Sequence, residues 1–425
     1  MAGATFSDVE SFGMLKELYS DDVEYQEFIA SSIYNFINKA TDVEFDGNYF
    51  NIPAKLQINE SYAAINDGER LPQAQITKGV FAKYRAKLMY NSIEATNFAA
   101  TRGHKNGRPD GKYIDDLMKG SLLSFMSNVD ADIYGNGRGF RGTIETATPA
   151  ATSFTCTSTM LIRPGMIFDW YDSTYATKRG TVQIALKGID RMNKTVYIDT
   201  SAFTGAVPTG ATAGDVLVVY NALATGEPAD GRHIMGLARV TDNTLTIGGL
   251  SPTDYAVWMS VNTNASGGNP TQELLQLHWD QQYLISGKYP NRMSINPGFK
   301  RAYLNQFLGQ RRFNSNSFDT GASSIDFQPV RMGKDEKGIK PQNMEILEDK
   351  NHPVDTTYIW SYDYFSLATD YSDAPHLADE DGNEMRFRPG YDSMMGFYRF
   401  WANTITQKRN CIGKIYGLAT PSGIL

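Results

Sequence analysis

Residues 112–136 read KYIDDLMKGSLLSFMSNVDADIYGN and form the longest clean helical pattern in the chain. Apolar residues recur there at steps of three and four, which places them on one face of an α-helix. They are Ile114, Leu117, Met118, Leu122, Phe125, Met126, Val129 and Ile133. Polar residues, among them Ser127 and Asp130, occupy the opposite edge. At about 1.5 Å per residue the helix would be about 35 Å long. We therefore expect it to be the spine of an extended subunit.

Three glycines directly after this helix, Gly137, Gly139 and Gly142, formally spell GxGxxG. A dinucleotide site needs a strand before such glycines and a helix after them, so that the pyrophosphate meets a helix N-terminus. Here a helix precedes the glycines and a Thr-rich, β-prone stretch follows them. Because this order is reversed, the glycines predict the end of the helix and a turn.

Size and composition allow two or three domains with substantial cores. The chain has 425 residues, of which 41% are hydrophobic and 12% aromatic, enough to bury a large apolar interior. Aromatic residues also suit interfaces, because they combine apolar area with a polar edge. With 40 Lys and Arg against 47 Asp and Glu, the net charge is −7. This charge disfavours a general affinity for nucleic acid or anionic membranes, but is compatible with a surface that faces packaged nucleic acid without gripping it.

The two cysteines, Cys156 and Cys411, lie far apart without C-x-x-C spacing. This indicates synthesis in a reducing compartment and no obligatory disulfide, with a single bridge left open. The N-terminus lacks a basic segment followed by an apolar core, so we expect no secretory signal. No run of about 18 apolar residues occurs, so we expect no membrane span.

The N-terminal part predicts a helical arm followed by a β-hairpin. Apolar residues follow helical spacing from about Ser7 to Lys39, with an N-cap near Ser20. From Val43 to Met89 the period changes to two, with a turn at Asp46-Gly47 and a polar connection, NDGERLPQAQITKG, inside the hairpin. A two-stranded arm has too little apolar cover to be stable alone in water. We therefore expect the hairpin to be stabilised by contacts outside its own subunit.

The rest of the chain is mainly β-structure. Short strands at roughly ten-residue intervals over residues 142–222 predict a small barrel or sandwich, with turns at Arg163-Pro164-Gly165 and Ala213-Gly214-Asp215. A mixed α/β part follows, with a helix over residues 271–286 and another after an Asn-Pro-Gly break. The final part is β-rich. No repeat of 20–50 residues is evident, which disfavours a solenoid or propeller.

No set of residues nominates a catalytic or metal site. The five histidines are predicted to be loop or packing residues, because they show no metal-ligand spacing; they are His104, His233, His278, His352 and His376. Residues 379–384, DEDGNE, resemble part of a calcium loop, but the glycine falls too early for an EF-hand, so we predict a solvated turn. Neither a G-x-S-x-G elbow nor a Walker motif occurs. We expect no enzyme activity, catalytic residue, metal or cofactor, although catalytic residues can also converge from distant positions.

The order of these features resembles the major capsid proteins of tailed bacteriophages, which have the Hong Kong 97-type fold. The similarity is strongest in two stretches near the end. Residues 270–308, PTQELLQLHWDQQYLISGKYPNRMSINPGFKRAYLNQFL, look like the segment that carries the helices of the axial domain. Residues 386–418 look like the closing aromatic-rich strand and its RN-x-x-G-x-I-x-G-L ending. Residues 142–222 depart from the minimal pattern and are read as a domain inserted in some members.

The resemblance implies an α+β fold with six segments. These would be an N-terminal arm (1–42), an extended β-hairpin loop (43–89), a peripheral domain with the spine helix (90–141), the inserted β-domain (142–222), an axial-type α/β domain (223–345) and a β-rich return through both domains (346–425). It further implies a structural protein that assembles in the host cytoplasm into hexamers and pentamers. These would form the icosahedral virion shell around double-stranded DNA, without sequence-specific binding and without a membrane.

The resemblance also implies partners and contact residues. The hairpin would reach over a neighbouring subunit, with Arg70, Lys78, Lys83 and Arg85 as candidate inter-subunit contacts. The hairpin and spine begin too early in the chain to leave room for a cleaved scaffolding segment, so scaffolding is expected to be a separate protein. Portal and decoration proteins are further partners that the family allows. One branch of the family cross-links Lys to Asn, but nothing selects Lys55, Lys78 or Lys83 for this, and we expect no cross-link.

The same sequence features are compatible with three other classes of protein. An encapsulin-like nanocompartment would enclose an enzyme instead of a genome, although the β-domain and the chain length favour the viral shell. A β-rich tail or fibre adhesin would bind carbohydrate through Tyr and Trp, and would form trimers. An enzyme ranks third.

Overall fold

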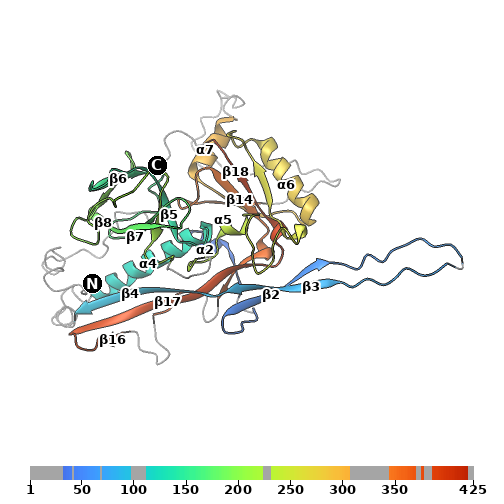
Figure 1. The fold of residues 1–425 in the computed structure, drawn as a ribbon, viewed down its shortest axis with the longest axis horizontal. Helices are drawn as coiled ribbons and strands as arrows, with labels where there is room; N and C mark the ends of the chain where they lie inside the picture. The colour runs from blue at the N-terminus through green and yellow to red at the C-terminus, as the bar shows by residue number, and fades with distance from the viewer. Residues whose placement is uncertain are drawn as a thin grey trace, which may run out of the picture.

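The computed structural model describes residues 32–40, 43–67, 69–96, 112–223, 231–306, 344–369, 375–377 and 385–419, with the backbone alone at 112–116, 304 and 306. It shows a mixed α+β protein. A long helix runs along a long sheet, a β-barrel and a second sheet lie on the same side of that long sheet, and a hairpin projects far from the body (Figure 1). Residues 1–31 of the arm predicted over residues 1–42 lie outside the described residues, as does the calcium-like turn at 379–384.

The long helix, α4 (Lys112–Tyr134), confirms the helix expected from the sequence. Phe125, Val129 and Ile133 are buried in the main hydrophobic core, as their spacing predicts. The polar edge differs from the prediction, because Ser127 and Asp130 are buried as well. The C-terminal half of α4 is enclosed by the short helix α2 (Ser32–Phe36) and by the turn around residue 350. A helical-wheel argument assumes solvent on one side, whereas residues 129–134 are buried on every side of the helix.

The long sheet joins segments from both ends of the chain. Its strands are β1 (Asn38–Ala40), β15 (Phe365–Thr369), β17 (Ser393–Thr406), β16 (Arg386–Phe387) and β4 (Lys87–Thr96). β4 pairs with β17 antiparallel from Thr96↔Ser393 to Lys87↔Ala402. Thus β4 begins within the segment assigned to the hairpin. The helix expected up to Lys39 ends at Phe36, because the following residues pair with β15.

The second sheet has the order β11-β18-β14-β12-β13. Its strands are β11 (Val261–Asn264), β18 (Ile412–Tyr416), β14 (Thr356–Trp360), β12 (Arg292–Ile295) and β13 (Glu345–Glu348). Two helices pack on it, α6 (Gln272–Ser286) and α7 (Pro297–Gln306), and both confirm the sequence prediction. α6 begins where Thr271 Oγ1 accepts from Leu274 N at 3.1 Å, and ends at the left-handed Gly287. Short turns complete the described chain: α5 (Leu237–Val240), η2 (Ala256–Trp258), η4 (Tyr362–Tyr364) and η5 (Arg409–Cys411).

A closed barrel of six strands confirms one of the two architectures that the sequence left open for the middle of the chain. The order around it is β10-β5-β6-β9-β8-β7. The strands are β5 (Phe140–Thr146), β6 (Ser153–Cys156), β7 (Ile167–Tyr171), β8 (Lys178–Asp190), β9 (Thr195–Ile198) and β10 (Val216–Val219). The barrel has a core of its own around Phe168 and Trp170. The predicted turns at Gly165 and Gly214 have φ values of 79° and 91°, which favour glycine.

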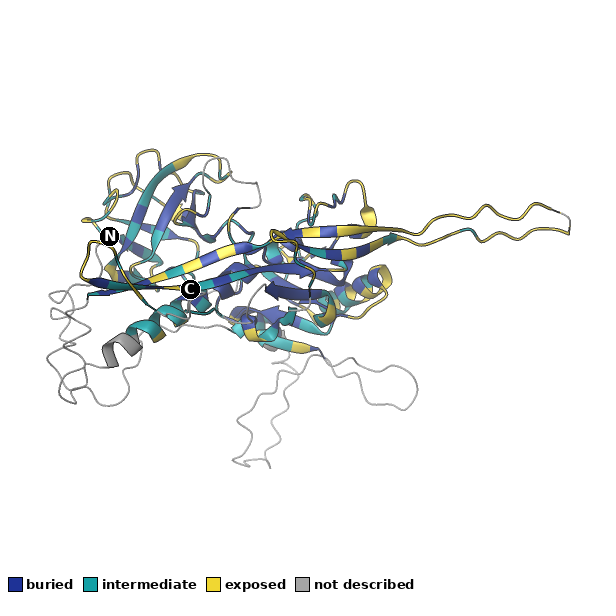
Figure 2. Cartoon of the chain, turned by 90° about the horizontal axis from the view of Figure 1, so that it is seen from below, coloured by how far each residue is buried: buried dark blue, intermediate teal, exposed yellow. Residues whose placement is uncertain are grey.

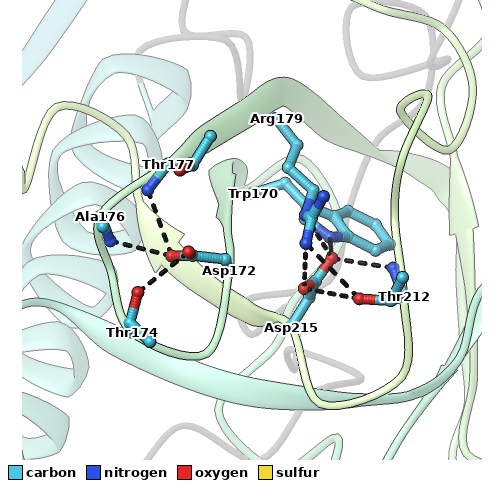
Figure 3. Close-up of polar contacts among 8 residues, drawn as sticks. All are labelled: Trp170, Asp172, Thr174, Ala176, Thr177, Arg179, Thr212 and Asp215. Atoms are coloured by element: carbon cyan, nitrogen blue, oxygen red, sulfur yellow. Dashed lines mark hydrogen bonds and ion pairs between the residues drawn. The ribbon is translucent and has the colours of Figure 1, made fainter.

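The buried carboxylate of Asp215, beside β10, connects several segments of the barrel (Figure 3). Asp215 accepts from Trp170 Nε1 at 2.9 Å and from Thr212 N at 2.9 Å, and pairs with Arg179 Nε at 2.8 Å. Asp172, on the loop after β7, accepts from backbone donors of that same loop. Because these carboxylates are occupied by the barrel's own donors, we read both clusters as structural.

The junction between α4 and the barrel is held by a second buried acid, Asp132. It pairs with Arg141 Nη2 at 2.8 Å and with His233 Nδ1 at 2.6 Å. Burial raises the pKa of Asp132, but the Arg141 guanidinium and the hydrogen bonds from His233 and Arg141 outweigh it, so that the net pKa is lowered. Gly139 has φ 67°, and a Cβ there would lie 2.9 Å from His233. Gly137 and Gly139 thus lie in the turn between helix and strand that the sequence predicted, whereas Gly142 lies within β5.

A third buried acid, Asp130, links α4 to α2 and to the turn after β13. Its Oδ1 accepts from Tyr34 N at 2.9 Å, and its Oδ2 from Asn351 Nδ2 at 3.4 Å. Asp349 accepts from Tyr134 Oη at 3.3 Å and is hydrogen-bonded to Asp130. Burial and the neighbouring Asp349 raise the pKa of Asp130 to about 8, and burial raises that of Asp349. The two carboxyls therefore share a proton near neutral pH.

We expect this pair to make stability fall as pH rises. The folded chain keeps the Asp130 proton up to about pH 8, whereas the unfolded chain releases it near 3.8, so the folded state binds more protons between these values. As the pH rises from 5 to 9, the unfolding free energy of Asp130→Asn should therefore rise by about 1–4 kcal/mol relative to that of wild type. Urea unfolding at both pH values, with the exposed Asp280→Asn as control, measures this. A constant difference between Asp130→Asn and wild type would contradict the shared proton.

Candidate functional site

The projecting hairpin is the candidate functional site. Its strands are β2 (Tyr49–Gln57) and β3 (Lys78–Arg85), paired antiparallel from Tyr49↔Arg85 to Gln57↔Lys78. Residues 58–67 and 69–77, the described part of the connection between them, contain no strand and extend the hairpin well beyond the body (Figure 1). The turn predicted at Asp46-Gly47 precedes β2, with Gly47 at φ 88° and Asp46 Oδ1 accepting from Tyr49 N at 2.9 Å.

The base of the hairpin belongs to the main core. Alternate residues of both strands face inward, including Phe50, Ile52 and Tyr84, all at most 3% exposed. Tyr84 Oη donates to Thr406 O at 2.8 Å, in the strand β17. Lys83 N donates to Gly248 O at 2.9 Å. These contacts hold the base rigidly, so the direction in which the hairpin leaves the body is fixed.

The outer part of the hairpin presents apolar side chains to solvent. Ile58, Tyr62, Leu71 and Ile76 are 64%, 94%, 74% and 77% exposed, and Phe81 on β3 is 56% exposed. Figure 2 shows the change from the buried base to the exposed connection. Burying one such side chain contributes about 1.5–3 kcal/mol. Several exposed apolar side chains on one protruding segment indicate an interaction surface, because the described part of the subunit leaves them uncovered.

The four basic residues selected from the sequence all lie on this hairpin and are exposed. Lys83 and Arg85 lie two residues apart on the outward face of β3, opposite Asn51 and Tyr49. Lys78 begins β3, and Arg70 lies on the connection, so the hairpin does not gather the four at one place. Their role as inter-subunit contacts stays a prediction.

Sequence reasoning missed the apolar residues of the connection. Residues 66–79 were read as polar, and Leu71 and Ile76 stand singly among polar neighbours there; Tyr62 lies just before that stretch. The available signal was the presence of large apolar residues in a segment too polar to form a core.

A cleft of about 580 Å³ lies at the base of the hairpin. Its lining includes Arg85, Lys87 and Arg232 together with Phe45 and Trp401. Lys87 is buried, and its Nζ donates to Gly231 O at 2.6 Å. The described lining holds cations and aromatic rings but no carboxylate, thiol or imidazole.

The described residues hold no group of three or more His, Cys, Asp and Glu that could bind a metal ion. His278 and His352 are buried, and burial lowers the pKa of each to about 4. His104 lies outside the described residues. Cys156 and Cys411 are buried and not bonded to each other. None of the helices in the described ranges is long and apolar enough to cross a membrane.

The fold is that of phage capsid proteins. The capsid asymmetric unit of cyanophage A-1(L) matches with a TM-score of 0.55, at 9% sequence identity, over 96% of this chain and 98% of that one. The SrpI encapsulin of Synechococcus elongatus PCC 7942 matches with a TM-score of 0.47 and 5% identity, over 98% and 97% of the two chains. The capsid of a native GTA particle matches with a TM-score of 0.47 and 7% identity, over 96% and 97%. No protein-family model and no curated protein matches the sequence.

The two parts of the hairpin should respond differently to mutation. Phe50→Ala removes a fully buried ring from the core and should cost about 3–5 kcal/mol of unfolding free energy. The triple variant Tyr62→Ser, Leu71→Ser, Ile76→Ser changes exposed residues and should stay within about 0.5 kcal/mol per site. Urea unfolding of the dissociated subunit distinguishes them. A large loss in the triple variant would mean that the connection folds back onto its own subunit.

Proposed function

We propose that this protein is the major capsid protein of a tailed bacteriophage, a structural subunit without enzymatic activity. In this proposal it assembles into hexamers and pentamers that form the icosahedral head around double-stranded DNA. The observation that carries the proposal is the hairpin, whose base is part of the core while its outer residues Tyr62, Leu71 and Ile76 face solvent.

The physical argument is that the subunit cannot cover this surface alone. A contact in which one copy's hairpin lies on a different surface of the next copy is heterologous, and heterologous contacts generate rings or continuous lattices. Burying five side chains of this size gives on the order of 10 kcal/mol per hairpin before the cost of ordering. Each subunit would give one hairpin and receive another, so the contact would be repeated throughout a closed shell.

In this proposal, each element of the fold corresponds to a part of a capsid subunit. We assign α4 as the spine helix and the β4–β17 sheet as the peripheral domain, with the second sheet and α6 as the axial domain. The barrel, between α4 and α5, takes the place of the inserted domain. The likeness to the cyanophage capsid unit covers nearly the whole length of both chains. The net charge of −7 is compatible with a shell that encloses DNA without binding it tightly.

Shortening the hairpin tests the proposal. Gln57 and Lys78 are paired, so residues 58–77 can be replaced by Asn-Gly, which closes a two-residue turn. This variant should fold, with an unfolding midpoint close to that of wild type, and should form no closed shells. Electron microscopy and analytical ultracentrifugation of wild type and variant measure the difference.

A matched control separates length from chemistry. Replacing the same residues by a Gly/Ser segment of equal length keeps the reach of the hairpin and removes its apolar side chains. We expect this variant also to lose assembly. Normal shells from the shortened variant would refute the role given to the hairpin.

The contents and shape of natural particles discriminate the alternatives. DNA-filled particles support the phage head, whereas a protein cargo without DNA would instead indicate an encapsulin-like compartment. Carbohydrate-binding trimers without shells would indicate a tail or fibre adhesin.

A further inference from the structure

The cleft at the base of the hairpin has the composition of an anion-binding site. Its volume of about 580 Å³ lies within the range of pockets that hold small organic ligands. Three cationic residues line it, Arg85, Lys87 and Arg232, and its described lining contains no acidic residue. The whole chain, by contrast, carries a net charge of −7. A local concentration of positive charge on an acidic protein therefore needs an explanation.

Four separate segments of the chain form this cleft. They are residues 45–48 before β2, residues 85–88 at the passage from β3 to β4, residues 231–232, and Trp401 on β17. Ala86 N donates to Asn48 O at 2.9 Å, which joins the first two segments. Lys87 Nζ donates to Gly231 O at 2.6 Å, which joins the second to the third. Because the walls are tied to one another, the cleft is formed before a ligand arrives.

Arg85 supplies donors that a ligand can reach. Its side chain is exposed, and its guanidinium has no hydrogen-bond or ion-pair partner among the residues that the structure describes. Its carbonyl oxygen accepts from Asn403 Nδ2 at 2.8 Å, which holds the backbone in place. Arg232 is exposed at the same cleft. A guanidinium offers five N–H donors and binds phosphate through paired hydrogen bonds.

Two aromatic rings form an apolar part of the lining. Phe45 and Trp401 are half-buried. The ring of Phe45 packs against that of the buried Phe50, with centroids 5.0 Å apart. Trp401 Nε1 donates to Tyr90 Oη at 3.2 Å, which orients the indole. Planar aromatic ligands stack on rings held in this way.

Charge and shape together select the class of ligand. A phosphate monoester carries almost two negative charges at neutral pH, which suits a group of cations better than the single charge of a carboxylate. Inorganic phosphate would leave the aromatic rings uncovered, and an uncharged ring compound would use none of the cations. A nucleotide has both parts, a phosphate and a planar base.

We propose that this cleft binds a nucleotide, with the phosphate on Arg85 and Arg232 and the base against the aromatic rings. The site does not depend on assembly, because a single subunit contributes the whole lining. The cleft lies where the hairpin joins the body, so a bound nucleotide contacts both and stabilises the base of the hairpin.

Calorimetric titration of the wild-type chain with AMP tests the proposal. AMP should bind with a Kd of about 1 mM or lower, and should raise the melting temperature, because it binds only the folded chain. Adenosine lacks the phosphate and inorganic phosphate lacks the base. Each should therefore bind at least about tenfold more weakly than AMP.

Variants of the cleft assign the two parts of the ligand. Arg85→Gln should weaken AMP binding at least about tenfold, because it removes a charged donor to the phosphate. Arg232→Gln should do the same and keeps the test valid if the first variant does not fold. Trp401→Leu should weaken AMP binding but leave the affinity for inorganic phosphate unchanged. Lys187→Gln removes one positive charge from the exposed surface of the barrel; this matched control should bind AMP as wild type does.

Competition experiments distinguish the source of the nucleotide. If a single-stranded oligoadenylate displaces AMP, nucleotides within a strand enter the cleft; if it does not, the cleft takes free nucleotides. Either result supports the site. Wild type that does not bind AMP, or unchanged AMP affinity in both arginine variants, would overturn the inference. A tetraglutamate peptide that binds more tightly than AMP would overturn it in favour of an acidic peptide. None of these measurements requires particles, so the capsid role is tested separately.

Discussion

The long strand β17 is the element on which the other parts of the subunit depend. It pairs with β4 along most of its length and with β15 at its end, which joins the two ends of the chain. Asn403 in β17 donates to Arg85 O at 2.8 Å at the hairpin base, and accepts from Met235 N at 2.9 Å in the segment before α5. Because one strand holds the hairpin, the long sheet and the body in register, the projecting hairpin keeps a defined direction. A defined direction is what a repeated contact between identical copies requires.

The distribution of polar and apolar residues departs from the usual pattern in two opposite ways. Inside the subunit, Asp130, Asp132 and Arg409 are buried and held by hydrogen bonds or ion pairs at the joins between segments. Outside it, the hairpin and α6 expose large apolar side chains. The buried polar groups specify how the segments join, since an unpaired charge in the interior would be costly. The exposed apolar groups are left uncovered by the described part of the subunit.

Much of the fold follows from local pattern. The helices α4 and α6 and the strands of the barrel were predictable, because helical or alternating periodicity within 5–25 residues reflects the face that each element buries. The pairing of β4 with β17 was not predictable, because the partner lies at the other end of the chain and no local signal names it. The candidate site was predictable as a long hairpin. The role of charges such as Arg70 and Lys78 as its contacts stays a prediction, and the exposed apolar side chains, which include Tyr62 and Ile76, were not selected from the sequence.

The sequence by itself determined where the chain forms helices, strands and turns, since these depend on neighbouring residues and on glycines such as Gly165 and Gly287. Only the tertiary structure decided which faces are covered. Asp130 lies on the polar side of its helix and is nevertheless buried, because α2 and the Asn351 turn close over it. Leu284 belongs to an apolar series and is nevertheless exposed, because His278 and Gln282 hold the other side of α6 against the sheet. Burial depends on what packs from elsewhere in the chain, and that information is not local.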